Sequence, residues 1–418
     1  MTERTTEPIR VGVLELEPTP ELHTAPHGLP VGAGEVQILL RRHGVPAGLL
    51  RTRIPEDADP LGHLAAMAPD APAPAPAPPA DPAARVSVIV ATRDRADKLD
   101  RALASLLELD HPDYEIVVVD NNPATSATQD LIAKKYAEAG VRHVTEPVPG
   151  LAAAHNRGIA EAKGAILAFT DDDVVADPQW LRALTAAFAD DPHVGCVTGL
   201  IVPARLETDA QIQLERLGGF GKGFARKVYD IHRPPADEPL FPFTAGSYGS
   251  GANMAFRAEV LREIGGFDPA TGTGTLARGG DDLYSFVRTL AAGHRLVYEP
   301  RALIWHYHRE RVEDLTSQAF NYGAGVTAYL TAIVARRPGL LPAFLKRVPG
   351  GLRHARALAS ARDRHAAAAE LDAWPRRLAR MERRGMLYGP IGYVRARRRV
   401  RGLARPWEVV DNCGGCGR

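Results

Sequence analysis

An apolar run of strand length ends abruptly at three carboxylates in the stretch Ala165-Ile166-Leu167-Ala168-Phe169-Thr170-Asp171-Asp172-Asp173. Such a run is typical of a buried strand, and open α/β folds bind their ligands at the carboxyl ends of the strands. Three adjacent carboxylates repel one another, and a divalent cation among them relieves that repulsion. The triplet therefore predicts a site for Mg²⁺ or Mn²⁺ that is shared with a phosphate-bearing substrate. A solvated turn or a helix N-cap is the alternative that the triplet alone leaves open.

The composition is that of an ordinary soluble protein, but the charge is unevenly distributed. The chain has 418 residues, of which 45% are hydrophobic and 24% are charged, and its formal net charge is +1. Residues 346–405 hold 17 Lys and Arg against 4 Asp and Glu, so the rest of the chain is acidic overall. This basic segment is expected to behave differently from the body of the protein.

The number of cysteines and the lengths of the apolar segments predict the cellular compartment of the protein. Three cysteines are too few for a disulfide framework, which fits a reducing cytosol. Cys413 and Cys416 could hold a metal, but a tail without fixed structure is the favoured interpretation. Residues 1–7 lack the apolar core of a signal peptide, and no run of about 18 apolar residues occurs. We therefore expect a cytoplasmic protein without a transmembrane helix.

The chain divides into five predicted segments. Residues 1–68 contain short apolar runs separated by Pro and Gly, which is typical of a small β-rich leader. The Pro/Ala repeat at 69–84 predicts an extended linker. An α/β domain is expected at 85–311, a helical basic extension at 312–408 and a short tail at 409–418.

Strands and helices alternate strictly from residue 86 onward, which predicts a parallel sheet with helices on both faces. The expected strands include 86–91 and 115–120, and the expected helices include 97–109 and 152–162. Ligands should collect where the strands end, at Thr92, Asp94, Arg95, Asp120 and the acidic triplet. Neither GxGxxG nor GxxxxGK[ST] is present, so side chains and a metal are the remaining means of holding a nucleotide.

Glycine-rich segments between residues 240 and 310 predict the second half of the site. Residues 246–253 are mostly small and suited to the close approach of a ligand, with Gly251 and Asn253 as candidates. Further on, Gly280 precedes Asp281-Asp282 at an expected helix start, where carboxylates are favourable and base chemistry is plausible. Simple N-capping is the alternative. His306 follows an expected strand and could complete a metal site, although a single His is more often structural.

Taken together, residues 86–311 resemble the family 2 glycosyltransferases, and in particular soluble actinobacterial-type members. The resemblance rests on the order and spacing of six motifs: Val88-Ile89-Val90-Ala91-Thr92-Arg93-Asp94-Arg95, Val117-Val118-Val119-Asp120-Asn121, Ala154-His155-Asn156-Arg157-Gly158-Ile159, Asp171-Asp172-Asp173, Gly265-Gly266-Phe267-Asp268, and Asp281-Asp282 with Arg288. It implies the GT-A fold, a Rossmann-like nucleotide-diphospho-sugar transferase with a mixed, mainly parallel sheet.

The resemblance also implies roles for individual residues. The nucleotide would contact Thr92, Asp94, Arg95, Asp120, Asn156, Asp171 and Asp172. The metal would be held by Asp173, with Asp171 and His306. Asp282 would be the general base with Asp281 beside it, and Gly251, Asn253 and Gly280 would line the sugar and acceptor loop. The family often has Arg where His155 stands and Glu where Asp281 stands, which puts the role of Asp281 in question.

The resulting prediction is an inverting glycosyltransferase that uses a UDP- or GDP-linked donor sugar and Mn²⁺ or Mg²⁺. The acceptor is open among a glycan, a lipid-linked molecule and a small molecule. The basic extension could contact the inner face of the membrane or could be a solvated helical face, and no nucleic acid is expected. A nucleotidyltransferase and a non-catalytic sugar-nucleotide or glycan-binding protein are the alternative functions.

Overall fold

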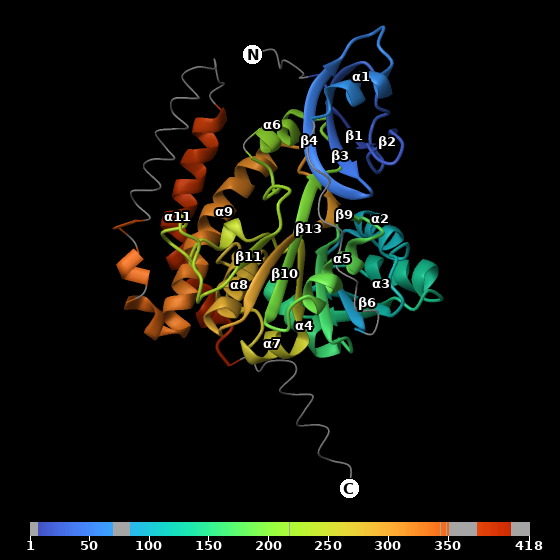
Figure 1. Cartoon of the computed structure of the whole chain (residues 1–418). Coiled ribbons are helices and arrows are strands. Elements are labelled where there is room, and N and C mark those ends of the chain that lie inside the picture. The colour runs from blue at the N-terminus through green and yellow to red at the C-terminus, as the bar shows by residue number, and fades with distance from the viewer. Residues whose placement is uncertain are drawn as a thin grey trace.

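The computed structural model of the chain describes residues 7–69, 84–216, 218–342, 344–347, 349–350 and 374–402 (Figure 1). Nearly all of the predicted Pro/Ala linker and the Cys413/Cys416 tail lie outside the described residues. The division of the chain into five segments therefore stays a proposal.

A sheet of nine strands forms the centre of the described structure, in the order β11-β13-β10-β12-β8-β5-β6-β7, with β9 paired to β13. The strands are β5 (Val86–Thr92), β6 (Tyr114–Asn121), β7 (Arg142–Glu146), β8 (Ile166–Asp171), β9 (Val174–Ala176), β10 (Val194–Pro203), β11 (Lys227–Tyr229), β12 (Asn253–Arg257) and β13 (Arg295–His306). The pairs among β5, β6, β7 and β8 are parallel, as is β10 with β13, while β9, β11 and β12 run antiparallel to their neighbours. The predicted mixed, mainly parallel α/β sheet is confirmed.

Helices cover both faces of this sheet, because successive strand residues point to opposite sides. Along β5, Ile89 belongs to one buried cluster, whereas Val88 and Val90 belong to the other. The covering helices are α2 (Ala96–Leu106), α3 (Ala127–Leu131) with a following π-helical turn (Ile132–Tyr136), α4 (Leu151–Glu161), α5 (Trp180–Ala189), α6 (Asp209–Arg216), α7 (Ala258–Glu263) and α8 (Asp281–Ala291). Two short 3₁₀ turns lie at Ala245–Ser247 and Pro338–Leu340.

Two parts of the sheet differ from the sequence-based expectation. The apolar runs at 296–298 and 302–305 predict two separate strands, but both belong to one long strand, β13, whose register with β10 shifts between Gly199 and Leu200. Pro300 lies in this irregular part, where a residue without an N–H is tolerated in a sheet. The segment expected to be a flexible loop up to residue 253 leads directly into β12, a fully paired strand between β8 and β10.

The N-terminal residues form a separate four-stranded sheet, in the order β2-β1-β3-β4. Its elements are β1 (Arg10–Glu15), β2 (Glu21–Thr24), β3 (Gly34–Arg42) and β4 (Val45–Ile54), followed by α1 (Pro60–Met67). Val11 and Leu39 of this sheet share one buried cluster with Leu200 and Trp305 of the central sheet and with Tyr307, which follows β13. The leader therefore packs on the β10–β13 side of the large sheet (Figure 1).

Two long helices, α9 (Val312–Arg336) and α11 (Trp374–Arg399), lie side by side and flank the central sheet (Figure 1). Gly385 and Gly389 of α11 bring its backbone against the carbonyls of Phe320 and Ala324 in α9, where a side chain would clash. Among the described residues, no helix is both long enough and apolar enough to cross a bilayer.

Candidate functional site

The acidic triplet lies in the turn between β8 and β9, at the edge of the sheet where β5, β6 and β8 end. Asp171 is the last residue of β8, and the chain turns back through Asp172 and Asp173 so that β9 pairs with the end of β13. The N–H of Tyr307 donates a hydrogen bond to the carbonyl of Asp173 (2.9 Å), which places His306 beside the triplet. Residues more than 130 positions apart in the chain thereby meet at one edge.

Asp171, Asp173 and His306 form a cluster that fits a divalent cation. One ligand atom from each of the three residues lies within 4.8 Å of the other two. His306 Nε2 is 3.5 Å from Oδ1 of Asp173, and burial lowers the pKa of His306 to about 4, so its imidazole is neutral at neutral pH. Two carboxylates and a neutral imidazole are a donor set that first-row divalent metals accept.

Asp172 is held by other partners and does not belong to this cluster. Thr92 donates its hydroxyl to one carboxylate oxygen (2.7 Å), and Arg95 Nη1 donates to the other (3.1 Å). Burial disfavours the charged form of Arg95, but Asp172 and Asp173 outweigh it and raise the pKa of the guanidinium. The pairing holds the permanent positive charge of Arg95 at the sheet edge, where the remaining N–H groups of the guanidinium could donate to a phosphate.

A second pair of acids faces the triplet from the start of α8. Burial, and then the neighbouring carboxylates of Asp173 and Asp172, raise the pKa of Asp171 well above its usual range. Asp281 adds to this shift, and it lies 3.3 Å from His155, whose ring packs against Phe169 two residues before Asp171. Such crowding of carboxylates is unfavourable unless a cation or protons compensate for it.

Gly251 and Gly280, which were predicted to line the sugar and acceptor loop, both contact the start of α8. Gly280 is the N-cap with a φ of +86°, and a side chain there would meet the carbonyl of Gly325 in α9. Gly251 donates its N–H to Oδ2 of Asp282 (2.9 Å), and the N–H of Leu283 reaches the other oxygen (2.8 Å). Burial and the adjacent Asp281 nevertheless raise the pKa of Asp282 to about 6.

His155 lies beneath Asp281 in a fully buried position. Its Nδ1 is 3.3 Å from Oδ2 of Asp281, and these two atoms have no hydrogen-bond partner among the described residues. The imidazole packs against the rings of Phe169 and Phe267. His155 therefore contacts Asp281, and Asp282 is the acid that is left more accessible.

The remaining predicted nucleotide contacts line the ends of β5 and β6. Asp120 is buried, one of its oxygens has no hydrogen-bond partner in the described part of the chain, and the other is 3.5 Å from Nε2 of His143. Burial raises the pKa of Asp120, against the effect of His143. Asp94 is exposed, has a φ of +52° and accepts the N–H of Ala124 (3.0 Å). An unpartnered buried oxygen next to an open edge suits recognition of a ligand N–H.

Two predicted site residues turn out to have structural roles instead. Asn253 is fully buried, accepts the indole N–H of Trp180 and donates to the carbonyls of Leu200 and Ala302, so its amide is not available to a ligand. Asn156 bonds both the N–H and the carbonyl of Phe267. Sequence position does not show where an amide side chain points, and the predicted ligand contacts of Asn253 and Asn156 depend on that direction.

A glycine-rich loop at residues 218–223 reaches the site and was not predicted to belong to it. The ring of Phe220 lies 5.0 Å from that of His306 and 6.3 Å from that of Tyr322 in α9. Burial lowers the pKa of Lys222, and the carboxylate of Asp282 partly offsets this effect. The alternation Gly218-Gly219-Phe220-Gly221-Lys222-Gly223 is the signal that could have identified the loop.

Asp268 anchors the long helices to the site loop. Its buried carboxylate accepts hydrogen bonds from Arg336 in α9 (3.1 and 3.2 Å) and from the hydroxyl of Tyr393 in α11 (2.9 Å). Phe267, the preceding residue, is the one held by Asn156. The segment leading to Asp281 is thus fixed from both sides.

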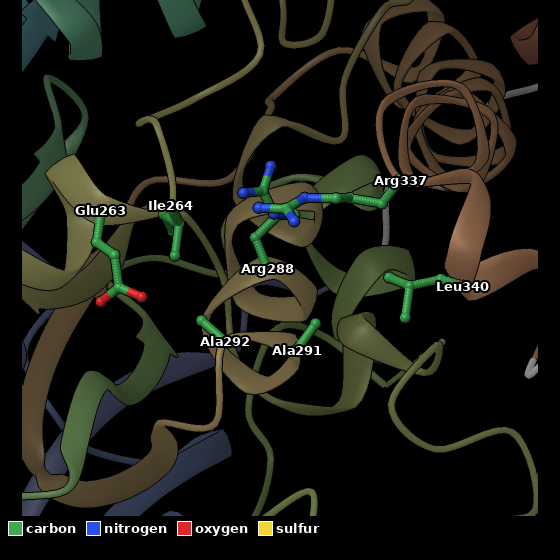
Figure 2. Close-up of a pocket in the computed structure, with 7 residues that line it drawn as sticks. All are labelled: Glu263, Ile264, Arg288, Ala291, Ala292, Arg337 and Leu340. Carbon is green, nitrogen blue, oxygen red and sulfur yellow. The ribbon is translucent and has the colours of Figure 1, made fainter.

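A separate pocket of about 250 Å³ lies at the opposite end of α8 from Asp281 and Asp282 (Figure 2). Arg288 reaches it from α8, and Arg337 reaches it from the chain that follows α9 (Figure 2). This pocket contains none of the predicted site residues. The sheet edge, and not this pocket, is the place where the candidate residues meet.

Comparisons with known proteins identify the family to which this chain is similar. Residues 87–265 match the family model described as glycosyl transferase family 2. The chain is 30% identical over 289 residues to a pre-mycofactocin glycosyltransferase of Mycobacterium tuberculosis, an alignment that covers 68% of this chain and 56% of the relative. It is 25% identical over 197 residues to a glucosyl-dolichyl phosphate glucuronosyltransferase of Haloferax volcanii, covering 45% and 57%. The chain thus spans about half the length of these curated relatives.

Among solved structures, the chain is similar to a mannosyltransferase, PcManGT from Pyrobaculum calidifontis, which was solved in complex with GDP-Man and Mn²⁺. The two share 22% sequence identity with a TM-score of 0.49, over 75% of this chain and 89% of that one.

Proposed function

Because this chain belongs to the family 2 glycosyltransferases, we propose that it transfers a sugar from a UDP- or GDP-linked donor to an acceptor hydroxyl, with inversion at the anomeric carbon. One observation supports this proposal above the others. The cluster of Asp171, Asp173 and His306 lies where β8 ends, and the distant pair Asp281 and Asp282 is joined to the same strand through His155, which contacts both Asp281 and Phe169. Two separate acidic groups suit a reaction that needs both a cation and a base.

Different residues at the sheet edge would bind the donor and act on the acceptor. Asp171, Asp173 and His306 would hold Mn²⁺ or Mg²⁺, which neutralises charge on the diphosphate when it is bound. Arg95, held by Asp172, would add a second positive charge beside the phosphates. Asp120, which has one oxygen without a partner among the residues that the structure describes, would accept an N–H of the nucleobase.

Asp282 would act on the acceptor. Its carboxylate takes the proton of the acceptor hydroxyl as that oxygen forms a bond to the anomeric carbon. The bond from the anomeric carbon to the diphosphate oxygen breaks in the same step, and the nucleoside diphosphate leaves with the electron pair. Because attack and departure occur on opposite faces, a single displacement inverts the anomeric centre.

The donor set favours Mn²⁺ over Mg²⁺ as the working metal. Mg²⁺ prefers oxygen ligands in a near-ideal octahedron, whereas a site with an imidazole nitrogen suits a softer first-row ion. His306 supplies that nitrogen in neutral form. We therefore propose that both ions can serve and that Mn²⁺ binds more tightly.

A panel of UDP- and GDP-sugars, each with and without Mn²⁺, tests this function. Release of the matching nucleoside diphosphate that depends on the metal is the expected result for at least one donor. A nucleotidyltransferase would instead release pyrophosphate from a nucleoside triphosphate, and a binding protein would retain its ligand without release. Either outcome would replace the proposed reaction.

The acid limb of the pH profile provides a further prediction. Asp282 must be ionised to accept a proton, and its pKa is raised to about 6, so kcat/KM should fall as the pH drops below about 6. Asp281→Asn removes the neighbouring negative charge that raises the pKa of Asp282, so the fall in kcat/KM should begin at a lower pH. A limb that stays in place in Asp281→Asn would contradict the assignment of the titration to Asp282.

We also propose a cytoplasmic location with peripheral contact at the membrane, through the outward face of α11. The face of α11 toward α9 carries small or buried residues, including Gly385, Gly389 and Ala396. The opposite face exposes Leu387, Ile391 and Val394, whose exposed fractions are 79%, 53% and 44%. At helical spacing these three side chains form one short apolar stripe.

Arginines flank this stripe on both sides along the helix. Exposed arginines precede it and follow it, namely Arg380, Arg383, Arg384, Arg395, Arg398 and Arg401. Glu382 is the one acidic residue between positions 377 and 402. An apolar stripe between cationic side chains fits the surface of an anionic bilayer, with the apolar groups in the interface and the arginines at the headgroups. A lipid-linked acceptor, as the name of the Haloferax relative indicates for that protein, would suit this location.

Vesicle flotation of the full chain tests the membrane contact. Vesicles with about 30 mol% phosphatidylglycerol should bind the protein, neutral vesicles should not, and high salt should release it. Leu387→Asp with Ile391→Asp should weaken binding roughly tenfold. The matched control, Leu49→Asp with Met67→Asp, changes two exposed apolar residues of the N-terminal sheet and α1 and should bind like the unmodified chain. A loss of self-association in place of vesicle binding would identify the stripe as a contact between copies.

A further inference from the structure

A chain of side-chain contacts runs from His306 away from the sheet edge. Nδ1 of His306 is 3.0 Å from Nδ1 of His308, and Nε2 of His308 is 2.9 Å from Oε1 of Glu215 in α6. His308 is buried, and its side chain is 1% exposed. The three side chains form a continuous line of contacts, with His306 at the candidate cation site and Glu215 at the other end.

Hydrogen-bond chemistry fixes the tautomers along this line. A carboxylate only accepts, so Nε2 of His308 must carry the proton that it donates to Glu215. In its neutral form His308 then has a bare Nδ1, which accepts the Nδ1–H of His306. His306 is left with a lone pair on Nε2, the atom that faces Asp173 at 3.5 Å. The line therefore gives His306 the tautomer that a metal ligand requires.

The N-terminal sheet holds the outer end of this line. Oε2 of Glu215 accepts hydrogen bonds from Arg51 in β4 (3.1 Å) and from Gln37 in β3 (3.4 Å). Arg51 Nε in turn donates to Oε1 of Gln37 (2.6 Å). Both oxygens of Glu215 are thus engaged, one by the leader and one by His308, so the carboxylate has little freedom to rotate.

Packing restrains the two imidazoles as well. The ring of Phe220 lies 5.0 Å from that of His306 and 5.4 Å from that of His308. The carbonyl of His308 lies 3.5 Å from the amide of Gln211 in α6. These contacts keep both rings in the orientation that the hydrogen bonds require.

We propose that His308 and Glu215 are positioning residues that orient His306 for the divalent cation, and that the N-terminal sheet supports them through Gln37 and Arg51. This inference rests on the proposed cation site. It gives the leader a role in the site, because its strands hold the outermost carboxylate of the line. Partners behind a metal-binding imidazole set its orientation and basicity, and their loss weakens metal binding by about 10–100-fold.

Mn²⁺ binding without a sugar donor, measured by electron paramagnetic resonance of the free ion, tests the proposal. His308→Phe keeps a ring in the cavity but removes the acceptor for His306, so Mn²⁺ affinity should fall by about 10–100-fold. His308→Asn places an oxygen near the position of Nδ1 and should recover most of that loss. Glu215→Ala should weaken binding, and Glu215→Gln, which keeps an acceptor oxygen, should weaken it less.

The control uses a similar pair away from the sheet edge. His294 Nε2 is 3.0 Å from Glu263, and His294→Phe should leave Mn²⁺ affinity unchanged. If His308→Phe binds Mn²⁺ as tightly as the unmodified chain, the inference is overturned. It is also overturned if His308→Phe and His308→Asn lose the same amount of Mn²⁺ affinity. Failure of the unmodified chain to bind Mn²⁺ would instead reject the cation site itself. Thermal unfolding in the absence of metal separates each of these results from loss of the fold.

Discussion

Asp282→Asn is expected to reduce sugar transfer by about 10²-fold or more, the usual contribution of a positioned general base. The substitution preserves the size of the side chain, and its oxygen can still accept the N–H of Gly251. Donor and Mn²⁺ binding should therefore change little, because the metal cluster consists of other residues. Transfer rates and donor affinity, measured on the same preparation, test both parts.

Asp281→Asn is the matched variant for this experiment. Asp281 directly precedes Asp282 in the chain, so the two acids have similar surroundings. Because Asp281 is buried against His155, it is less accessible to an acceptor. Its substitution should cost less activity than that of Asp282. Near-normal transfer by Asp282→Asn would make the base assignment wrong, and Asp281 would be the next candidate.

Asp173→Ala should abolish the metal dependence of nucleoside diphosphate binding. Asp173 supplies the oxygen nearest to His306, and its other oxygen lies 3.6 Å from Arg95. Without this carboxylate the cluster retains one acid and one imidazole, which is too few protein ligands to anchor a divalent ion. Calorimetry with UDP and with GDP, each with and without Mn²⁺, measures the effect.

A control for Asp173→Ala is Asp190→Ala, which removes an acid that pairs with Arg226 at the end of α5. This variant should bind nucleotide and metal like the unmodified chain. If Asp173→Ala keeps its metal-dependent affinity, the cation is held elsewhere.

The sheet and much of the site edge could be predicted because their signals are local. The run 165–173 combines an apolar strand with three acids, and both properties are visible in nine consecutive residues. β5 and β6 were predicted for the same reason, since a strand buried on both faces is continuously apolar. A helix beginning next to Asp281 and Asp282 was also predicted, because acids after a glycine are favourable in a first turn, and α8 begins at Asp281.

Other features depend on contacts between distant residues and could not be predicted from one sequence. Asn253 looked like a loop residue, but pairing with β8 and β10 places it in a central strand. Glu215 and His308 are 93 positions apart and meet only because α6 packs beside the end of β13. The position of Phe220 likewise depends on packing, because the glycines around it do not indicate that its ring contacts His306.

Anomalous diffraction from crystals grown with MnCl₂ and UDP or GDP tests the central claim most directly. We expect one Mn²⁺ peak between Asp171, Asp173 and His306, with the diphosphate beside it and the nucleobase at Asp120. A bound nucleoside diphosphate with its Mn²⁺ away from these three side chains, or a nucleotide in the pocket of Arg288 and Arg337, would contradict the account.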